Sequence, residues 1–91
     1  LLQVFANYLK LQQGLRIQIN GHTDDVGDAA RNLALSEQRA KAVAAYLELL
    51  GVASERMQFR GYGETQPRVE NDSAANRALN RRTEFEILSI Q

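Results

Sequence analysis

A long helical segment between two short strand-like segments limits the possible folds more than any other feature of this chain. Leu15, Ile17 and Ile19 alternate with polar residues, which is the pattern of a half-buried strand, and residues 57–60 repeat the alternation. Between them, residues 29–50 consist mainly of good helix formers. A helix that joins two strands of one sheet makes a right-handed crossover, so the two strands are expected to be parallel. The sequence therefore predicts an α/β fold.

The other segments extend this pattern to an alternation of three helices and three strands. Apolar residues at helical spacing predict an opening helix that ends near Gly14, residues 73–82 predict a short helix capped by Asp72 or Ser73, and residues 84–87 predict a last strand. We expect a single domain over residues 1–91, because a chain of this length can build only one small core. No strand precedes the opening helix, so we expect an N-terminally truncated piece whose further strand was cut away or comes from a neighbouring chain.

The composition excludes several classes of function. The 11 basic and 11 acidic side chains cancel, so no overall field attracts nucleic acid and we expect no nucleic-acid partner. Nine of the basic residues are arginine, which favours fork-shaped recognition of carboxylates. The absence of cysteine rules out disulfides, thiol nucleophiles and cysteine-based zinc sites. No apolar run approaches the roughly 18 residues of a membrane span, so any membrane attachment is expected through regions outside this chain.

The predicted long helix has polar residues on the stripe that is expected to face the sheet. At about 100° per residue, Val43 and Tyr46 lie within about 40° of Arg39, and Asn32 and Ser36 lie on or near the same face. This stripe is apolar in its C-terminal half and polar in its N-terminal half, whereas a core-facing stripe is normally apolar throughout. We therefore expect a pocket at the start of the helix.

Asp24 lies in the turn between the first strand and the long helix, at the end of the sheet where this pocket is expected. Ligands of parallel α/β sheets bind beyond the carboxyl ends of the strands, near helix N-termini. Asp24 and Arg39 can therefore face each other across a cleft, where the carboxylate would hold an ammonium group and the guanidinium would grip a carboxylate. Such a pair suits a zwitterion, such as an amino acid. The structural alternative is that Asp24 only bonds its own turn and Arg39 only forms a surface ion pair.

Metal and nucleophile chemistry fit the sequence less well. His22, Asp24, Asp25 and Asp28 miss the spacing of a calcium loop, and one histidine without cysteine is too few for a typical zinc site, so we expect no metal and no cofactor. His22 is instead expected to brace its turn by hydrogen bonds. Ser36 lies within a helix and lacks a nucleophile elbow, so we expect no enzymatic activity.

Two further motifs have structural explanations. Gly61-Tyr62-Gly63 lacks the third glycine of a dinucleotide loop and is interpreted as a turn. The arginines at positions 77, 81 and 82 are the best argument for a nucleic-acid surface, but Glu84 and Glu86 follow them directly. These arginines are therefore expected to cap toward the sheet or to clamp carboxylates.

The order and spacing of several motifs resemble those of the OmpA-like C-terminal domain, a family that includes peptidoglycan-associated lipoproteins and flagellar stator proteins. The shared motifs cover nearly the whole chain from residue 17 to residue 87. They are Gly21-His22-Thr23-Asp24-x-x-Gly27, Asn32-x-x-Leu35-Ser36-x-x-Arg39-Ala40, Gly51-Val52, Gly61-Tyr62-Gly63-Glu64-x-x-Pro67, Asn71 and Arg77-x-x-Asn80-Arg81-Arg82-x-Glu84. The resemblance implies an α+β sandwich, in which helices pack on a small mixed parallel and antiparallel sheet. It also implies a strand before the opening helix, which this chain lacks.

The resemblance further implies a function, because the family binds peptidoglycan non-covalently through the diaminopimelate of the stem peptide. The family's ligand-binding positions correspond to Asp24 and Arg39, which hold the ammonium and the carboxylate of the ligand, to Asn32, which lines the pocket, and to Arg81, which contacts a ligand carboxylate. We therefore expect a non-catalytic tether in the periplasm of a Gram-negative bacterium. Regions outside this chain would anchor it to the outer or inner membrane.

A second hypothesis is a protein-interaction or assembly module with the same fold and no affinity for the cell wall. A sheet edge left open by the absent strand could pair two copies by strand addition. A homodimer is therefore the alternative partner.

Overall fold

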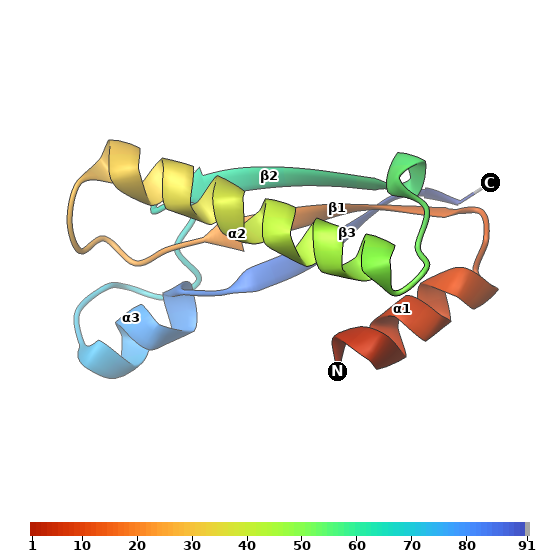
Figure 1. Ribbon diagram of the computed structural model, residues 1–91. Coiled ribbons are helices and arrows are strands. Elements are labelled where there is room, and N and C mark those ends of the chain that lie inside the picture. The colour runs from red at the N-terminus through yellow and green to blue at the C-terminus, as the bar shows by residue number, and fades with distance from the viewer. Residues whose placement is uncertain (91) are drawn as a thin grey trace.

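The computed structural model describes residues 1–90, in which helices and strands alternate along the chain as the sequence predicts (Figure 1). The strands are β1, Leu15–His22, β2, Met57–Gly63, and β3, Thr83–Ile90. The helices are α1, Leu2–Leu11, α2, Ala29–Leu49, and α3, Ala74–Asn80, and a short 3-10 helix, Ser54–Arg56, precedes β2.

The three strands form one mixed sheet in the order β2-β1-β3. The strand β1 pairs in parallel with β2, with Ile19 opposite Phe59, as expected for strands that a long helix connects. On its other side β1 pairs antiparallel with β3, with Ile19 opposite Phe85. The mixed sheet implied by the family resemblance is thus confirmed.

Helices α1 and α2 pack against one face of the sheet, and α3 lies beyond the end where β1 and β2 finish (Figure 1). Every second residue of β1 faces the core, as the period of a strand requires. The side chain of Arg56 links the end of α1 to the start of β1 by donating to the carbonyl oxygens of Leu9 (2.6 Å) and Leu15 (3.1 Å). The buried core consists of Ala6, Leu9, Leu15, Ile17, Ile19, Ala40, Leu47 and Val52.

Helix α2 lies unusually close to the ends of β1 and β2. A Cβ atom on Gly21 would lie 2.2 Å from the Ser36 carbonyl oxygen, and a Cβ atom on Gly61 would lie 2.4 Å from the Glu37 nitrogen. Only glycine therefore fits at these two strand positions. The same close approach requires small side chains on the helix, and both Ser36 and Ala40 are fully buried there.

This close approach corrects the predicted core-facing stripe of the long helix. The residues of α2 that are buried are Asn32, Ser36, Ala40 and Leu47, whereas Arg39 is exposed and Tyr46 is 47% exposed. The prediction that Arg39 and Tyr46 lie on this stripe is therefore wrong. The helix is rotated because backbone contact with the glycines selects its small residues rather than its large apolar ones. The predicted polar N-terminal half of the stripe is present, formed by Asn32 and Ser36.

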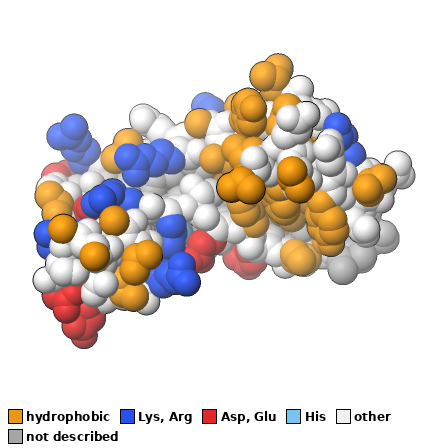
Figure 2. All heavy atoms as spheres, turned by 90° about the horizontal axis from the view of Figure 1, so that it is seen from below, with side chains coloured by type: hydrophobic (Ala, Val, Ile, Leu, Met, Phe, Trp, Pro, Cys, Tyr) orange, Lys and Arg blue, Asp and Glu red, His pale blue; other side chains and the backbone are white. Residues whose placement is uncertain are grey.

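The two ends of the molecule differ in surface character. Figure 2 shows hydrophobic side chains gathered over the α1 end, and Lys and Arg side chains at the α3 end. Exposed apolar residues include Val4 of α1 and Ile87 of β3. Within the described residues, none of the helices is both long enough and apolar enough to cross a lipid bilayer.

Candidate functional site

Backbone hydrogen bonds to both neighbouring strands fix the start of the loop that follows β1. The His22 nitrogen donates to the carbonyl oxygen of Arg82 (2.9 Å), and the Thr23 nitrogen donates to that of Gly63 (2.9 Å). The last residues of β1 are thus held between the end of β2 and the start of β3. Asp24 follows directly, so its side chain begins at the open end of the sheet.

Asp24 is a buried carboxylate, 8% exposed, with two partners. Its Oδ1 accepts from the Val26 nitrogen (3.0 Å), and its Oδ2 accepts from Nη1 of Arg81 (2.6 Å). The Arg81 guanidinium holds the pKa of Asp24 below its usual value, and the Val26 N–H acts in the same direction while burial opposes both. Asp24 is therefore ionised at neutral pH.

Asn32 of α2 orders the loop that contains Asp24. The helix begins after Asp28, whose Oδ2 caps it by accepting from the Arg31 nitrogen (3.0 Å). One turn into the helix, Nδ2 of the buried Asn32 donates to the carbonyl oxygen of Val26 (3.0 Å) and reaches that of Asp24 (3.4 Å). A polar residue at this position of the buried stripe thus satisfies loop carbonyl groups that would otherwise lack partners.

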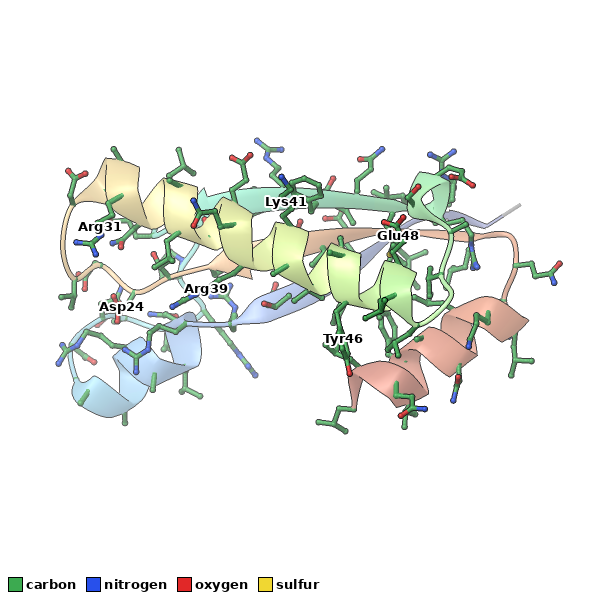
Figure 3. The ribbon with its side chains drawn as sticks, viewed as in Figure 1. Asp24, Arg31, Arg39, Lys41, Tyr46 and Glu48 are labelled. Carbon is green, nitrogen blue, oxygen red and sulfur yellow. The ribbon has the colours of Figure 1, made fainter. Side chains whose placement is uncertain are left out.

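A pocket of about 360 Å³ lies between this loop, the first half of α2 and the end of α3. Figure 3 shows Asp24, Arg31 and Arg39 on the side of α2 that faces α3. All four residues predicted to bind a ligand, Asp24, Asn32, Arg39 and Arg81, line this pocket. The remaining lining residues are Thr23, Val26, Gly27, Arg31 and Leu35.

Asp24 and Arg39 are expected to face each other across a cleft, and both line the pocket without forming an ion pair with each other. Asp24 is bridged by Arg81, which comes from the far end of the sequence. Arg39 is exposed and, among residues 1–90, makes neither an ion pair nor a side-chain hydrogen bond. The structural alternative, a surface ion pair of Arg39, is therefore not formed in this part of the chain. Asp24 does bond its own turn, through Val26, as well as facing the pocket.

Two features of the site were missed from the sequence. Arg31 lines the pocket one position before Asn32. At about 100° per residue it lies about 80° from Arg39, outside the predicted stripe, so a helical projection does not find it. The second feature is Asn80, which is fully buried at the end of α3. No pattern in the sequence marks Asn80 as buried, because an asparagine near a helix end is usually exposed.

Asn80 holds a loop against the end of α3 and so positions the residue that follows it. Its Oδ1 accepts from the backbone nitrogens of Arg68 (2.8 Å) and Val69 (3.1 Å). Its Nδ2 donates to the carbonyl oxygen of Val69 (2.8 Å) and to Oδ1 of Asn71 (2.7 Å). All the hydrogen-bonding capacity of this amide is thus used inside the protein, next to Arg81.

Ser36 has a structural part in the site. Its hydroxyl donates to the carbonyl oxygen of Leu33 (2.8 Å) and accepts from the Gly63 nitrogen (2.9 Å), which ties α2 to the end of β2. The side chain is fully buried, so no substrate can reach the hydroxyl. Among the described residues, no three His, Cys, Asp or Glu side chains are grouped as they would be around a metal ion.

His22 does not brace the turn by side-chain hydrogen bonds, so that expectation is wrong. Its buried Nδ1 has no hydrogen-bond partner in the part of the chain that the structure describes. The ring stacks on Tyr62, with 5.4 Å between centroids, and Nε2 lies 3.8 Å from Oε1 of Glu84. Burial lowers the pKa of His22, and the nearby Arg82 guanidinium lowers it further, against the attraction of Glu84. Ring stacking, not hydrogen bonding, is what the side chain of His22 contributes here.

The fold and the pocket define a small α/β domain with charged side chains around a pocket at the open end of its sheet. The sequence matches the OmpA family over residues 1–81, and the chain belongs to that family. This confirms the resemblance found in its motifs.

Two curated relatives carry the same domain. The peptidoglycan-associated lipoprotein of Legionella pneumophila is 41% identical over 80 residues, which cover 88% of this chain and 46% of the lipoprotein. The peptidoglycan-binding protein ArfA of Mycobacterium tuberculosis is 41% identical over 85 residues, which cover 93% of this chain and 26% of ArfA. The chain thus spans less than half the length of these relatives.

Solved structures share the fold. The peptidoglycan-associated lipoprotein from Burkholderia pseudomallei superposes with a TM-score of 0.91 at 38% identity, over 96% of this chain and 74% of that one. The periplasmic domain of Helicobacter pylori MotB superposes with a TM-score of 0.84 at 30% identity, over 94% of this chain and 58% of that one.

Proposed function

We propose that this domain binds peptidoglycan non-covalently, through the diaminopimelate residue of the stem peptide. The observation that carries the proposal is the presence around one pocket of a buried, ionised carboxylate on Asp24 and of a guanidinium on Arg39 that pairs with no side chain in residues 1–90. The side-chain end of diaminopimelate has an ammonium group and a carboxylate on one carbon. Each of its two charges therefore has a counterpart in the pocket.

Each of the four predicted pocket residues has a separate role in binding the ligand. The ligand's ammonium group docks on the carboxylate of Asp24, whose oxygens each have room for a further hydrogen bond beside those from Val26 and Arg81. The ligand's carboxylate docks on the guanidinium of Arg39. Arg81 stabilises the ionised form of Asp24, and its other side-chain N–H groups, which make no hydrogen bond within residues 1–90, can contact a ligand carboxylate. Asn32 holds the loop in place, so the carboxylate needs little rearrangement when the ligand arrives.

The names of the relatives support peptidoglycan as the ligand. One curated relative is a peptidoglycan-associated lipoprotein and another is a peptidoglycan-binding protein. A solved relative is a periplasmic domain, and peptidoglycan lies in the same compartment. We therefore propose a non-catalytic tether in the periplasm of a Gram-negative bacterium, held at the outer or inner membrane by regions outside this chain.

A titration with two tripeptides tests the proposal, L-Ala-γ-D-Glu followed either by meso-diaminopimelate or by L-lysine. The α-amino group of the third residue is in the peptide bond of both peptides, so only diaminopimelate keeps an ammonium group and a carboxylate on one carbon, and the lysine side chain lacks the carboxylate that Arg39 would hold. We expect the diaminopimelate peptide to shift the amide resonances of the pocket at a concentration at least about tenfold lower than the lysine peptide does, because a charged hydrogen bond is worth about 1.5–3 kcal/mol. Equal affinities would contradict the assignment of Arg39, and binding should persist in the presence of a chelator.

One observation favours a second candidate function, an assembly module. Within the described strands β3 lies at the edge of the sheet, and Ile87 on that strand is 62% exposed. Two copies could pair along this edge. Sedimentation velocity would show a dimer that Ile87→Lys disrupts, whereas a monomer at all concentrations would count against this function.

A further inference from the structure

We propose that Arg31 is a specificity-determining residue of the pocket, and that it binds a second carboxylate on the residue next to the zwitterionic head of the ligand. This inference rests on the proposed function of the site. It starts from the position of Arg31, which lines the same pocket as Asp24 and Arg39 and comes from the first turn of α2 (Figure 3).

The charge balance of the pocket leaves Arg31 without a counter-charge. The lining contains one carboxylate, Asp24, and three guanidinium groups, those of Arg31, Arg39 and Arg81. Asp24 and Arg81 already form an ion pair at 2.6 Å. A zwitterionic head adds one charge of each sign, so it balances Arg39 but leaves the pocket with excess positive charge. A ligand with one more negative charge fits this lining better.

No protein group supplies that charge within the described residues. The side chain of Arg31 is exposed and makes no hydrogen bond or ion pair in residues 1–90. The nearest acidic neighbour in the chain, Asp28, is engaged at the helix cap, where its Oδ2 accepts from the Arg31 backbone nitrogen. A free arginine at the mouth of a pocket is well suited to a ligand carboxylate, because its planar fork matches that group.

The spacing along α2 sets the distance between the two ligand carboxylates. Arg31 and Arg39 are eight residues apart, which is about 12 Å along a helix axis. Two flexible arginine side chains can shorten or lengthen this span by several ångströms. Within one stem peptide, the free α-carboxylate of the D-glutamate lies one residue from the side-chain carboxylate of diaminopimelate. This is the group that we assign to Arg31.

The assignment predicts a preference for stem peptides whose D-glutamate is not amidated. The test uses two synthetic tripeptides, L-Ala-γ-D-Glu-meso-diaminopimelate and the same peptide with D-isoglutamine in place of D-glutamate. Calorimetry or fluorescence titration is carried out on the wild-type domain, on Arg31→Gln and on Lys41→Gln. Lys41 is exposed on the same helix and lies outside the pocket, so its variant removes an equal charge without touching the site (Figure 3).

We expect the wild-type domain to bind the free tripeptide about fivefold more tightly than the amidated one, the upper range for one exposed ion pair. In Arg31→Gln this ratio falls to about one, because only the affinity for the free tripeptide decreases. Lys41→Gln keeps the wild-type ratio.

Two results would overturn the assignment while leaving the proposed function intact. In one, Arg31→Gln retains the wild-type ratio. In the other, it weakens both tripeptides equally, which would mean that Arg31 acts only through general attraction. If the wild-type domain bound neither tripeptide, the proposed function itself would fail and this inference with it.

Discussion

The close approach of α2 to β1 can be tested with one methyl group, in the variant Gly21→Ala. The new Cβ would lie 2.2 Å from the Ser36 carbonyl oxygen, where ordinary contact begins at 3.4 Å, so α2 would have to move by about 1 Å. Overpacking costs about 1–3 kcal/mol, and the upper end applies here because the neighbours are backbone atoms that cannot rotate away. A loss of about 3 kcal/mol lowers the Tm of a domain of this size by roughly 12–24 °C.

Thermal and urea unfolding followed by circular dichroism measures this loss, with Gly27→Ala as the matched control. Gly27 has a φ of +92° and nothing within 4 Å of its would-be Cβ, so alanine there costs only backbone strain, about 1–2 kcal/mol. Gly21 has no positive φ, so alanine there adds no backbone strain, and the loss of stability measures the steric overlap with α2 alone. The reasoning would be refuted if Gly21→Ala destabilised the domain no more than Gly27→Ala.

Three further predictions concern polar groups around the site. Asn80→Ala should lower the free energy of unfolding by about 3 kcal/mol in urea titrations, because backbone groups of Arg68 and Val69 lose their hydrogen-bond partner. Asn80→Asp keeps the two bonds that the side-chain oxygen accepts and should be less destabilising. A larger loss for Asn80→Asp than for Asn80→Ala would contradict the account. Burial lowers the pKa of His22 below 6.5, so the neutral imidazole contributes to the free energy of unfolding in full above pH 6.5, and this contribution is lost as the pH falls through the lowered pKa. An NMR titration of this single histidine measures the pKa, and a value of 6.5 or higher would contradict the account. The pKa of Asp24 is lowered, so its ionised carboxylate contributes to the free energy of unfolding in full above about pH 3.8, and this contribution is lost as the pH falls further. The stability of Asp24→Asn should therefore depend less on acid pH than that of the wild-type domain. An unchanged dependence would exclude a stabilising role of the Asp24 charge.

The order of helices and strands could be predicted because the hydrophobic patterns that indicate them lie within short stretches of the sequence. The alternation of Leu15, Ile17 and Ile19 marks the central strand, and the long helix after it requires a crossover to a parallel neighbour. The family resemblance added the expectation of a mixed sheet, and the structure identifies β3 as its antiparallel strand. Asp24, Asn32 and Arg39 could be placed at the helix start because they lie near one another in the sequence.

Other parts of the site depend on contacts between distant segments. The pairing of Arg81 with Asp24 joins residues 57 positions apart, and only the family resemblance assigned Arg81 to the pocket. The rotation of α2 depends on Gly21 and Gly61, which admit the helix backbone at van der Waals distance. A helical projection assumes that large apolar side chains face the core, so it favoured Tyr46 over Ala40. Close packing of backbones reverses that preference.

The proposal that Asp24 and Arg39 hold the two charges of one ligand is tested most directly by co-sedimentation with purified peptidoglycan sacculi. Asp24→Asn and Arg39→Gln each remove one charge of the proposed pair, and Lys41→Gln is the control on the same helix. We predict that the wild-type domain and Lys41→Gln sediment with the sacculi. The two pocket variants should stay mainly in the supernatant while keeping the wild-type circular dichroism spectrum, since removing the buried Asp24 charge costs about 2–5 kcal/mol and losing a charged hydrogen bond of Arg39 costs about 1.5–3 kcal/mol. Sedimentation of both pocket variants to the wild-type extent would contradict the central claim.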